Sequence, residues 1–174
     1  MKELFQKMFK LSSTELYRVL EERLQSGRKT FIVTANPETF MNLCQIPQLY
    51  SRMFDENTMM TPDGEGIVYA ARKMNYKLWG KIAGVETVQK LLELGDRFGS
   101  KAYFFGAKQE VLDRLASKLR VQYPHLKIVG LQNGYVENRE PIFEDMQQKT
   151  PDLIFVALGV PCQEEEIAKH IDSF

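Results

Sequence analysis

The strongest constraint on the fold is an alternation of short apolar segments with amphipathic ones. Residues 30–35 (TFIVTA) and 101–106 (KAYFFG) are largely apolar, which is typical of strands that are buried on both faces. In residues 12–27 the apolar side chains recur at helical spacing instead. Such strands, connected by such helices, form a parallel sheet. We therefore predict an α/β, Rossmann-like fold, with a mostly parallel sheet and helices on both faces.

The same patterns give approximate bounds for each element. Ser12 and Glu15 have the spacing of a capping box, and Pro37 suits the first turn of a helix. The first ten residues alternate apolar and basic side chains, which fits either a packed terminal segment or a weak interfacial patch. We expect strands at residues 30–35, 57–60, 101–106, 126–131 and 152–159, and helices at residues 12–27, 37–44, 66–74, 85–98, 108–123, 141–149 and 161–170.

Composition narrows the class of partner. The 174 residues suit one domain, residues 1–174, and the 23 basic side chains balance the 23 acidic ones, so we expect no nucleic-acid partner. No apolar run reaches the roughly 20 residues of a membrane span. Cys44 and Cys162 are far apart, and neither His125 nor His170 has a ligand-spaced partner. These features predict free thiols in a reducing cytoplasm and no built-in metal site.

Polar or glycine-rich clusters follow all five predicted strands. Ligands of open parallel sheets bind beyond the carboxyl ends of the strands. If the strands are parallel, these clusters meet at one edge of the sheet and are candidates for a binding site. They are TANPE (34–38), TPDGEG (61–66), GAKQE (106–110), QNGY (132–135) and LGVPCQEEE (158–166).

Each cluster also has a purely structural interpretation. Asp63, between Pro62 and Gly64, is either an ordinary turn residue or a carboxylate that the turn holds in position for a function. Thr34 and Asn36 either contact a ligand or cap the following helix.

The later clusters leave similar alternatives. Gly106 and Lys108 form either a simple turn with a solvated lysine or a seat for a phosphate at a helix N-terminus. Asn133 is followed by glycine, a pair that predicts a tight turn in any fold. Gln163 is an amide suited to a sugar hydroxyl, or part of a solvated acidic turn with Glu164–Glu166. Neither GxxxxGK[ST] nor GxGxxG occurs, which argues against P-loop and dinucleotide-binding proteins.

Taken in order along the chain, six segments resemble the WecG/TagA/CpsF glycosyltransferase family. The resemblance runs from about Leu11 to Phe174, and the ordered set is more specific than any one motif. The segments are TANPE (34–38), PDGEGIVYAAR (62–72), KIAGVE (81–86), YFFGAK (103–108), YPHLKIVGLQNGY (123–135) and VALGVPCQE (156–164).

The resemblance implies an inverting hexosyltransferase that uses neither metal nor cofactor. Its substrates would be a UDP-sugar donor, with N-acetylmannosamine or a related sugar, and a polyprenyl-diphosphate-linked N-acetylglucosamine acceptor. It would work as a peripheral protein at the cytoplasmic face of the membrane, in the synthesis of wall teichoic acid or surface polysaccharide. The family's general base falls on Asp63, and Thr34, Asn36 and Gln163 match substrate-contacting positions.

The departing UDP diphosphate needs charge stabilisation from cations and N–H groups. Lys81, Lys108 and Arg72 are the candidate cations, and we expect Gly106, Asn133 and Tyr135 to belong to the substrate-binding loops.

The sequence also departs from the family pattern. Lys81 stands where the family has arginine, Glu86 where it has aspartate, and Cys162 where it has lysine. The family also continues past Phe174 with a basic appendage that contacts the membrane, and begins with a strand before Leu11. The alternative is therefore an impaired or truncated member that only binds nucleotide-sugar. A homo-oligomer is compatible with the sequence.

Overall fold

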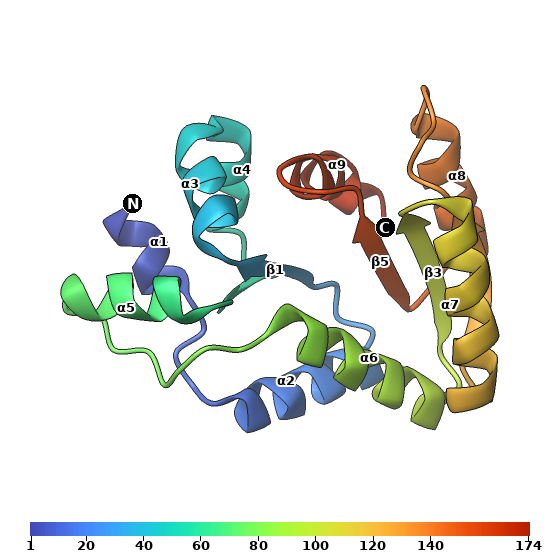
Figure 1. The fold of residues 1–174 in the computed structure, drawn as a ribbon, viewed down its shortest axis with the longest axis horizontal. Helices are drawn as coiled ribbons and strands as arrows, with labels where there is room; N and C mark the ends of the chain where they lie inside the picture. Colours follow the sequence, from blue (N-terminus) through green and yellow to red (C-terminus); the bar gives the residue numbers. More distant parts are fainter. The chain divides into compact units, whose positions relative to one another are not determined.

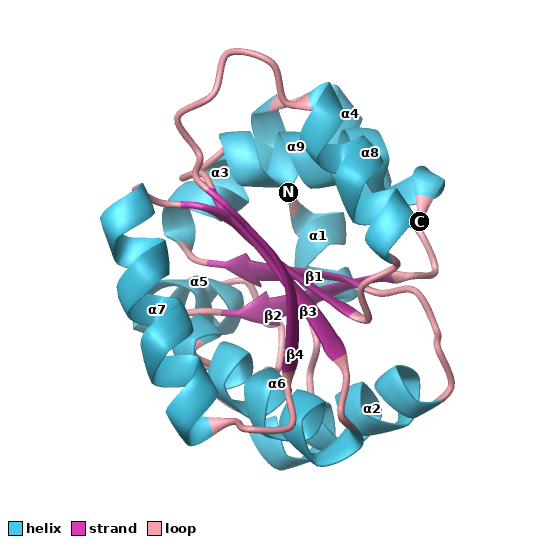
Figure 2. Cartoon of the chain, turned by 90° about the vertical axis from the view of Figure 1, so that its right-hand side faces the viewer, coloured by secondary structure: helices cyan, strands magenta, loops and turns pink.

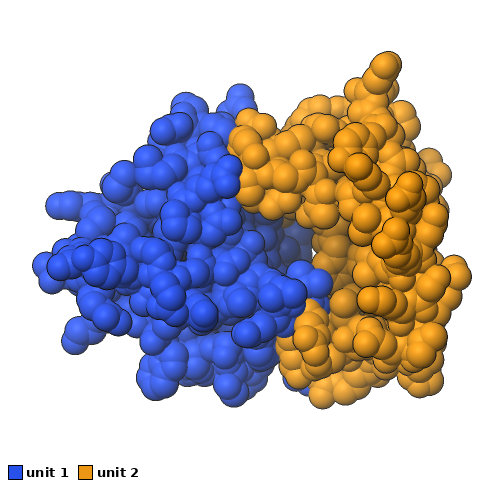
Figure 3. Space-filling model, viewed as in Figure 1, with its two compact units in different colours: residues 1–88 blue, residues 89–174 orange.

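The computed structural model describes residues 1–174 as two compact units, residues 1–88 and 89–174 (Figure 3). The boundary falls within helix α6 (Gly84–Phe98). Each unit consists of parallel strands connected by helices, so the predicted Rossmann-like α/β class is confirmed. The prediction of a single domain over residues 1–174 stays a prediction.

The first unit, whose helices α1 to α5 are labelled in Figure 1, is built on a pair of parallel strands. Strands β1 and β2 pair from Phe31 opposite Thr58 to Ala35 opposite Pro62. Strand β2 thus ends two residues later than predicted, and the carbonyl of Pro62 accepts a hydrogen bond from the N–H of Ile82 at 2.7 Å. The elements of this unit are α1 (Lys2–Lys7), α2 (Ser13–Gln25), β1 (Phe31–Ala35), α3 (Pro37–Gln45), α4 (Pro47–Arg52), β2 (Thr58–Pro62), α5 (Glu65–Lys73) and the start of α6.

Local signals account for where these helices begin. The predicted capping box of α2 is present, with reciprocal hydrogen bonds between Ser12 and Glu15. Helix α4, which we did not predict, begins at Pro47 and has only six residues, too few to show a periodic pattern. No helix in the structure is long and apolar enough to cross a membrane.

The N-terminal segment packs into the first unit. Leu4, Phe5 and Met8 are buried, and the ring centroid of Phe5 lies 4.5 Å from that of Phe40. Met8 forms a parallel bridge with Met60 of β2. Of the two interpretations of this segment, the packed one is therefore confirmed for Leu4, Phe5 and Met8.

The second unit contains a three-stranded parallel sheet in the order β4-β3-β5. Figure 2 labels two of its strands, β3 and β4. Helix α7 connects the central strand β3 to β4 at one edge of the sheet, and α8 connects β4 to β5 at the opposite edge. Right-handed crossovers in opposite directions place α7 and α8 on opposite faces of the sheet. The elements after α6 are β3 (Lys101–Gly106), α7 (Gln109–Gln122), β4 (Lys127–Gln132), α8 (Glu140–Lys149), β5 (Leu153–Ala157), α9 (Cys162–His170) and a 3₁₀ turn (Ile171–Ser173).

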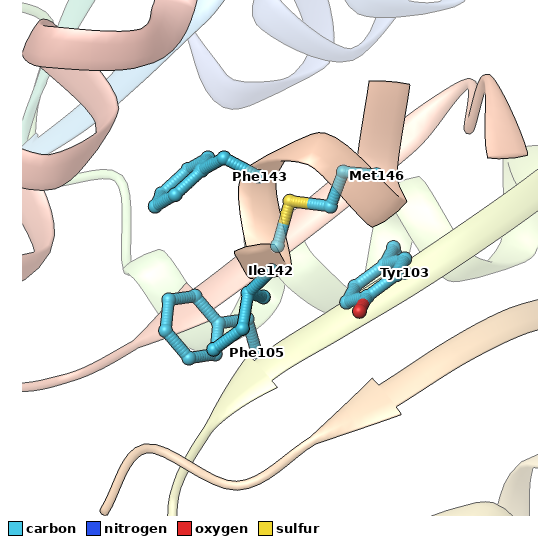
Figure 4. Close-up of a cluster of buried hydrophobic side chains, with 5 residues drawn as sticks. All are labelled: Tyr103, Phe105, Ile142, Phe143 and Met146. Carbon is cyan, nitrogen blue, oxygen red and sulfur yellow. The ribbon is translucent and has the colours of Figure 1, made fainter. Parts of the chain in front are cut away.

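A cluster of aromatic and aliphatic side chains joins β3 to α8 (Figure 4). Tyr103 and Phe105 point to the same face of the sheet because they are two residues apart on one strand. They pack there against Ile142, Phe143 and Met146. The hydroxyl of Tyr103 also donates a hydrogen bond to Asp145 at 2.9 Å. Burial, together with this carboxylate, raises the pKa of Tyr103 well above its usual range.

Strand β4 makes room for the Tyr103 ring with a glycine. The pairing with β3 shifts by one residue, so that Ala102 lies opposite Ile128 but Tyr103 lies opposite Gly130. A Cβ atom at Gly130 would lie 2.1 Å from Cε2 of Tyr103. Even one methyl group at this position would displace the ring from the core cluster.

We expect Gly130→Ala to lower the free energy of unfolding by about 2–4 kcal/mol, the range for overpacking a core. Urea denaturation would measure this loss. Gly80→Ala is the matched control, because a Cβ atom there meets nothing within 4 Å, so its unfolding curve should overlay that of the wild type. Equal stability of the two variants would contradict the close approach of Tyr103 to Gly130.

Candidate functional site

In the first unit, the carboxyl ends of β1 and β2 bring two of the sequence clusters together. The last paired residues are Ala35 and Pro62, and the N–H of Asp63 then donates to the carbonyl of Ala35 at 3.1 Å. Thr34 and Asn36 therefore lie beside Asp63, as the parallel arrangement predicts.

A third loop holds the carboxylate of Asp63. The N–H of Gly84, the first residue of α6, donates to Oδ2 of Asp63 at 3.2 Å. A Cβ atom at Gly84 would lie 3.0 Å from Cγ2 of Thr34 and 3.2 Å from the same oxygen. Gly84 therefore lets the start of α6 approach both side chains, so that Thr34, Asp63 and Gly84 form one contact group.

Asn36 has the structural role that the sequence left open. It is the N-cap of α3, and its Oδ1 accepts a hydrogen bond from the N–H of Thr39 at 2.9 Å. This cap does not use the amide nitrogen Nδ2. Capping and ligand contact are thus compatible, because they need different atoms of one side chain.

The N-terminal ends of three helices meet around Asp63. Helix α6 begins at Gly84, which touches Thr34 and Asp63, and α5 begins just after Asp63 and Gly64. A Cβ atom at Gly66 would lie 3.0 Å from Cγ of Pro37, the first residue of α3. Helix N-termini carry partial positive charge, which favours an anionic group at this corner of the unit.

The basic candidates of the first unit differ in their surroundings. Lys81 is exposed and lies 3.7 Å from a carboxylate oxygen of Glu65, so its charge is partly balanced. Arg72 lies in the last turn of α5, roughly 10 Å along the helix axis from the end that follows Asp63. Lys81 is therefore the better placed of the two cations.

In the second unit, backbone hydrogen bonds join the loops that follow β3, β4 and β5. The N–H of Ala107 donates to the carbonyl of Ala157, and the N–H of Gly134 donates to the carbonyl of Ala107, both at 3.0 Å. Gly106 has a φ of 123°, and a Cβ atom there would lie 2.1 Å from the carbonyl oxygen of Ala157. Gly106 is therefore required by the backbone, whatever it contributes to a ligand.

The polar residues on these loops are accessible. Lys108 is the exposed N-cap of α7 and provides no side-chain cap. Asn133 accepts a hydrogen bond from the N–H of Tyr135 at 3.1 Å, which makes it a turn residue. Tyr135 itself is 74% exposed. Lys108 and Tyr135 are thus free to meet a ligand from solvent.

The start of α9 differs from the solvated acidic turn that one interpretation predicted. Glu164 is buried, and Glu166 forms an ion pair with Arg139 at 2.9 Å. Only Glu165 is exposed. The amide nitrogen of Gln163 donates to Glu164 at 2.9 Å, which leaves its Oε1 outside that bond.

Two supporting residues were not predicted from the sequence. Gly84 positions Asp63, and Arg139 ties the loop after β4 to α9 through Glu166 and the sulfur of Cys162, at 3.0 Å. Neither role has a local pattern, because each depends on a contact with a distant segment.

The structure thus divides the predicted site residues between the units. The first unit holds Thr34, Asn36, Asp63 and Lys81, and the second holds Gly106, Lys108, Asn133, Tyr135 and Gln163. Within each unit the strand ends bring the loops together. Their meeting at one common edge stays a prediction, as do the roles of the individual residues. The structure contains no group of three or more His, Cys, Asp or Glu side chains that could hold a metal ion.

Comparison with known proteins gives a consistent result. The sequence model of the Glycosyl transferase WecG/TagA/CpsF family matches residues 4–174. A protein of Bacillus spizizenii is 32% identical over 147 residues, covering 84% of this chain and 57% of the relative. Proteins of Bacillus subtilis (33% over 139 residues; 80% and 54%) and Staphylococcus aureus strain NCTC 8325 (31% over 151 residues; 86% and 59%) are similar.

These three relatives share one name, N-acetylglucosaminyldiphosphoundecaprenol N-acetyl-beta-D-mannosaminyltransferase. The chain spans a little over half of the length of each.

The cap at Asn36 gives a testable prediction. We expect Asn36→Ala to lower the free energy of unfolding by about 1 kcal/mol, because the N–H of Thr39 loses its partner. Asn36→Asp keeps an oxygen at this position and should be as stable as the wild type. Thermal and urea denaturation would compare the variants, and a stability of Asn36→Ala equal to that of Asn36→Asp would contradict the cap.

Proposed function

Because this chain belongs to the WecG/TagA/CpsF family of glycosyl transferases, we propose that it carries the catalytic core of a UDP-sugar-dependent hexosyltransferase. Its relatives are named for the transfer of N-acetylmannosamine to N-acetylglucosaminyl-diphosphoundecaprenol. The proposed reaction moves N-acetylmannosamine or a related sugar from UDP to a polyprenyl-diphosphate-linked N-acetylglucosamine. One structural observation is the main support for this proposal: the carboxylate of Asp63 accepts a hydrogen bond from the N–H of Gly84 and lies beside Thr34.

Asp63 is the proposed general base. A sugar hydroxyl is a weak nucleophile, and a positioned carboxylate can accept its proton as the new bond forms. The hydroxyl oxygen then bonds to C1 of the donor sugar while the bond from C1 to the UDP oxygen breaks, with inversion at C1. Since Oδ2 accepts the hydrogen bond from Gly84, Oδ1 is the oxygen that takes the proton.

Thr34 and Asn36 are the proposed substrate contacts beside the base. The methyl group of Thr34 faces Gly84, so the hydroxyl is the part of that side chain available to a sugar. Asn36 uses Oδ1 for its cap, so the amide nitrogen Nδ2 is the proposed donor. Both groups are neutral, which suits the hydroxyls and the acetamido oxygen of an N-acetylhexosamine.

The departing diphosphate requires positive charge. In the first unit, Lys81 and the N-termini of α3, α5 and α6 are the proposed source. In the second unit, Lys108 and the loop at Gly106 offer a cation and a helix N-terminus.

The remaining candidates of the second unit are proposed donor contacts. The exposed ring of Tyr135 is suited to stack on a base. Asn133 and Gln163 contribute amide groups to the same set.

The acceptor named for the relatives is a polyprenyl lipid. We therefore propose a peripheral position at the inner face of the cell membrane and a role in the synthesis of wall teichoic acid or another surface polysaccharide.

A substitution of Asp63 tests the base directly. Asp63→Asn keeps an oxygen that can accept the hydrogen bond from Gly84, but it cannot accept the proton. We expect turnover to fall roughly 10²- to 10⁴-fold, while affinity for UDP-sugar and melting temperature stay close to wild type. The assay follows UDP release with a lipid-diphosphate acceptor, in the protein as expressed from its gene.

Asp55→Asn is the matched control in the same unit, because Asp55 forms a surface ion pair with Arg52. Its turnover should be unchanged. Turnover of Asp63→Asn within about threefold of wild type, with folding intact, would falsify the catalytic role.

Donor binding tests the proposal at an earlier step. We expect UDP-N-acetylhexosamines to bind without added metal, and EDTA to leave the affinity unchanged. Isothermal titration calorimetry would measure this. Binding that appears only with a divalent cation would overturn the metal-independent mechanism, and binding without any turnover would favour the alternative of a protein that only binds nucleotide-sugar.

A further inference from the structure

The loop between α5 and α6 places a tryptophan in solvent. Trp79 is 79% exposed, more than any other aromatic residue of the chain. Tryptophan side chains are on average highly buried in folded proteins. An indole exposed to this degree indicates a surface that meets something other than water.

The backbone around Trp79 is held in place. Its N–H donates to the carbonyl of Lys10 at 3.2 Å, and Ile82, three residues later, is bonded to Pro62. In Figure 1 this green loop runs beside the blue segment between α1 and α2. The indole is thus presented from a backbone that is hydrogen-bonded at Trp79 itself and again at Ile82.

The surroundings of Trp79 are basic. Lys10, Lys77 and Lys81 are exposed on the two joined segments, and Leu11 is 50% exposed. Glu65 pairs with Lys81 at 3.7 Å. Since the whole chain has a formal net charge of zero, this positive charge is local. We refer to Lys10, Leu11, Lys77, Trp79 and Lys81 as the Trp79 patch.

We infer that the Trp79 patch rests on the surface of an anionic lipid bilayer. Tryptophan prefers the boundary between headgroups and acyl chains, and lysines beside it attract anionic headgroups. A protein partner fits the patch less well, because lysine is depleted in protein interfaces. One indole and one leucine among lysines also form no continuous apolar surface.

This inference rests on the proposed function and adds the part of the surface that faces the lipid. Lys81 and Gly84 are three residues apart, so their Cα atoms lie within about 11 Å. Gly84 contacts Asp63. A patch seated in the headgroup layer would therefore hold the Asp63 loop near the depth of the acceptor's diphosphate, which lies at the membrane surface.

The single tryptophan of the chain makes the test specific. With vesicles of phosphatidylcholine and phosphatidylglycerol, we expect the fluorescence of Trp79 to shift to shorter wavelength and to be quenched by brominated lipids. Both effects should weaken at high salt, because salt screens the lysines. An unchanged spectrum and the absence of quenching at low salt would overturn the inference.

Charge variants give the second arm of this test. Each lysine near an anionic surface contributes roughly fivefold to partitioning, so the double variant Lys10→Gln/Lys77→Gln should bind these vesicles roughly 25-fold more weakly. The control is Lys118→Gln/Lys127→Gln, which removes two exposed lysines of the second unit and should bind as the wild type does. Equal loss in both double variants would show that the attraction is not local, and would also overturn the inference.

Asp63→Asn separates this inference from the proposed function. It should partition like the wild type, because it leaves the patch unchanged. If the protein turns over a soluble short-chain acceptor but does not contact vesicles, the inference about the Trp79 patch is refuted and the proposed function is not. Vesicle contact through Trp79, in a protein that neither binds UDP-sugar nor turns over, would refute the proposed function alone.

Discussion

The pairing of β1 with β2 is the interaction on which the candidate site depends. It is parallel, so both strands end at the same place, and the hydrogen bond from Asp63 to Ala35 extends it by one residue. The N–H of Gly84 then reaches the carboxylate of Asp63. A carboxylate on a turn would otherwise sample several rotamers. Here the sheet fixes its backbone and a helix terminus orients its oxygens.

The second unit reaches a similar result mainly through contacts between backbone groups. Gly106 and Gly134 allow the loops after three strands to approach until N–H and carbonyl groups bond directly. Side chains such as Lys108 and Tyr135 are then presented from a rigid base. Arg139 adds a charged connection from one of these loops to α9. Both units therefore use small residues at the strand ends, where the backbone must pass closely.

Much of this architecture could be predicted from local patterns. The apolar segments, the capping box of Ser12 and the proline at the start of α3 identified most strands and helices, because each signal acts over a few residues. The end of β2 was misjudged, since Thr61 and Pro62 join the strand through pairing with a distant segment. Burial of Glu164 and the role of Gly84 were not predictable for the same reason. Both depend on long-range contacts that have no signature in the neighbouring sequence.

The double use of Asn36 has a consequence for how such proteins diverge. One oxygen of this side chain closes the start of α3, while the neighbouring nitrogen is the group proposed to meet the sugar. Any replacement chosen to accept a different sugar must also be a good helix cap, which restricts the choice to a few short polar residues. Evolutionary change in sugar preference should therefore accumulate at neighbouring positions that do not also cap a helix. Position 36 should vary slowly, even between members with different donors.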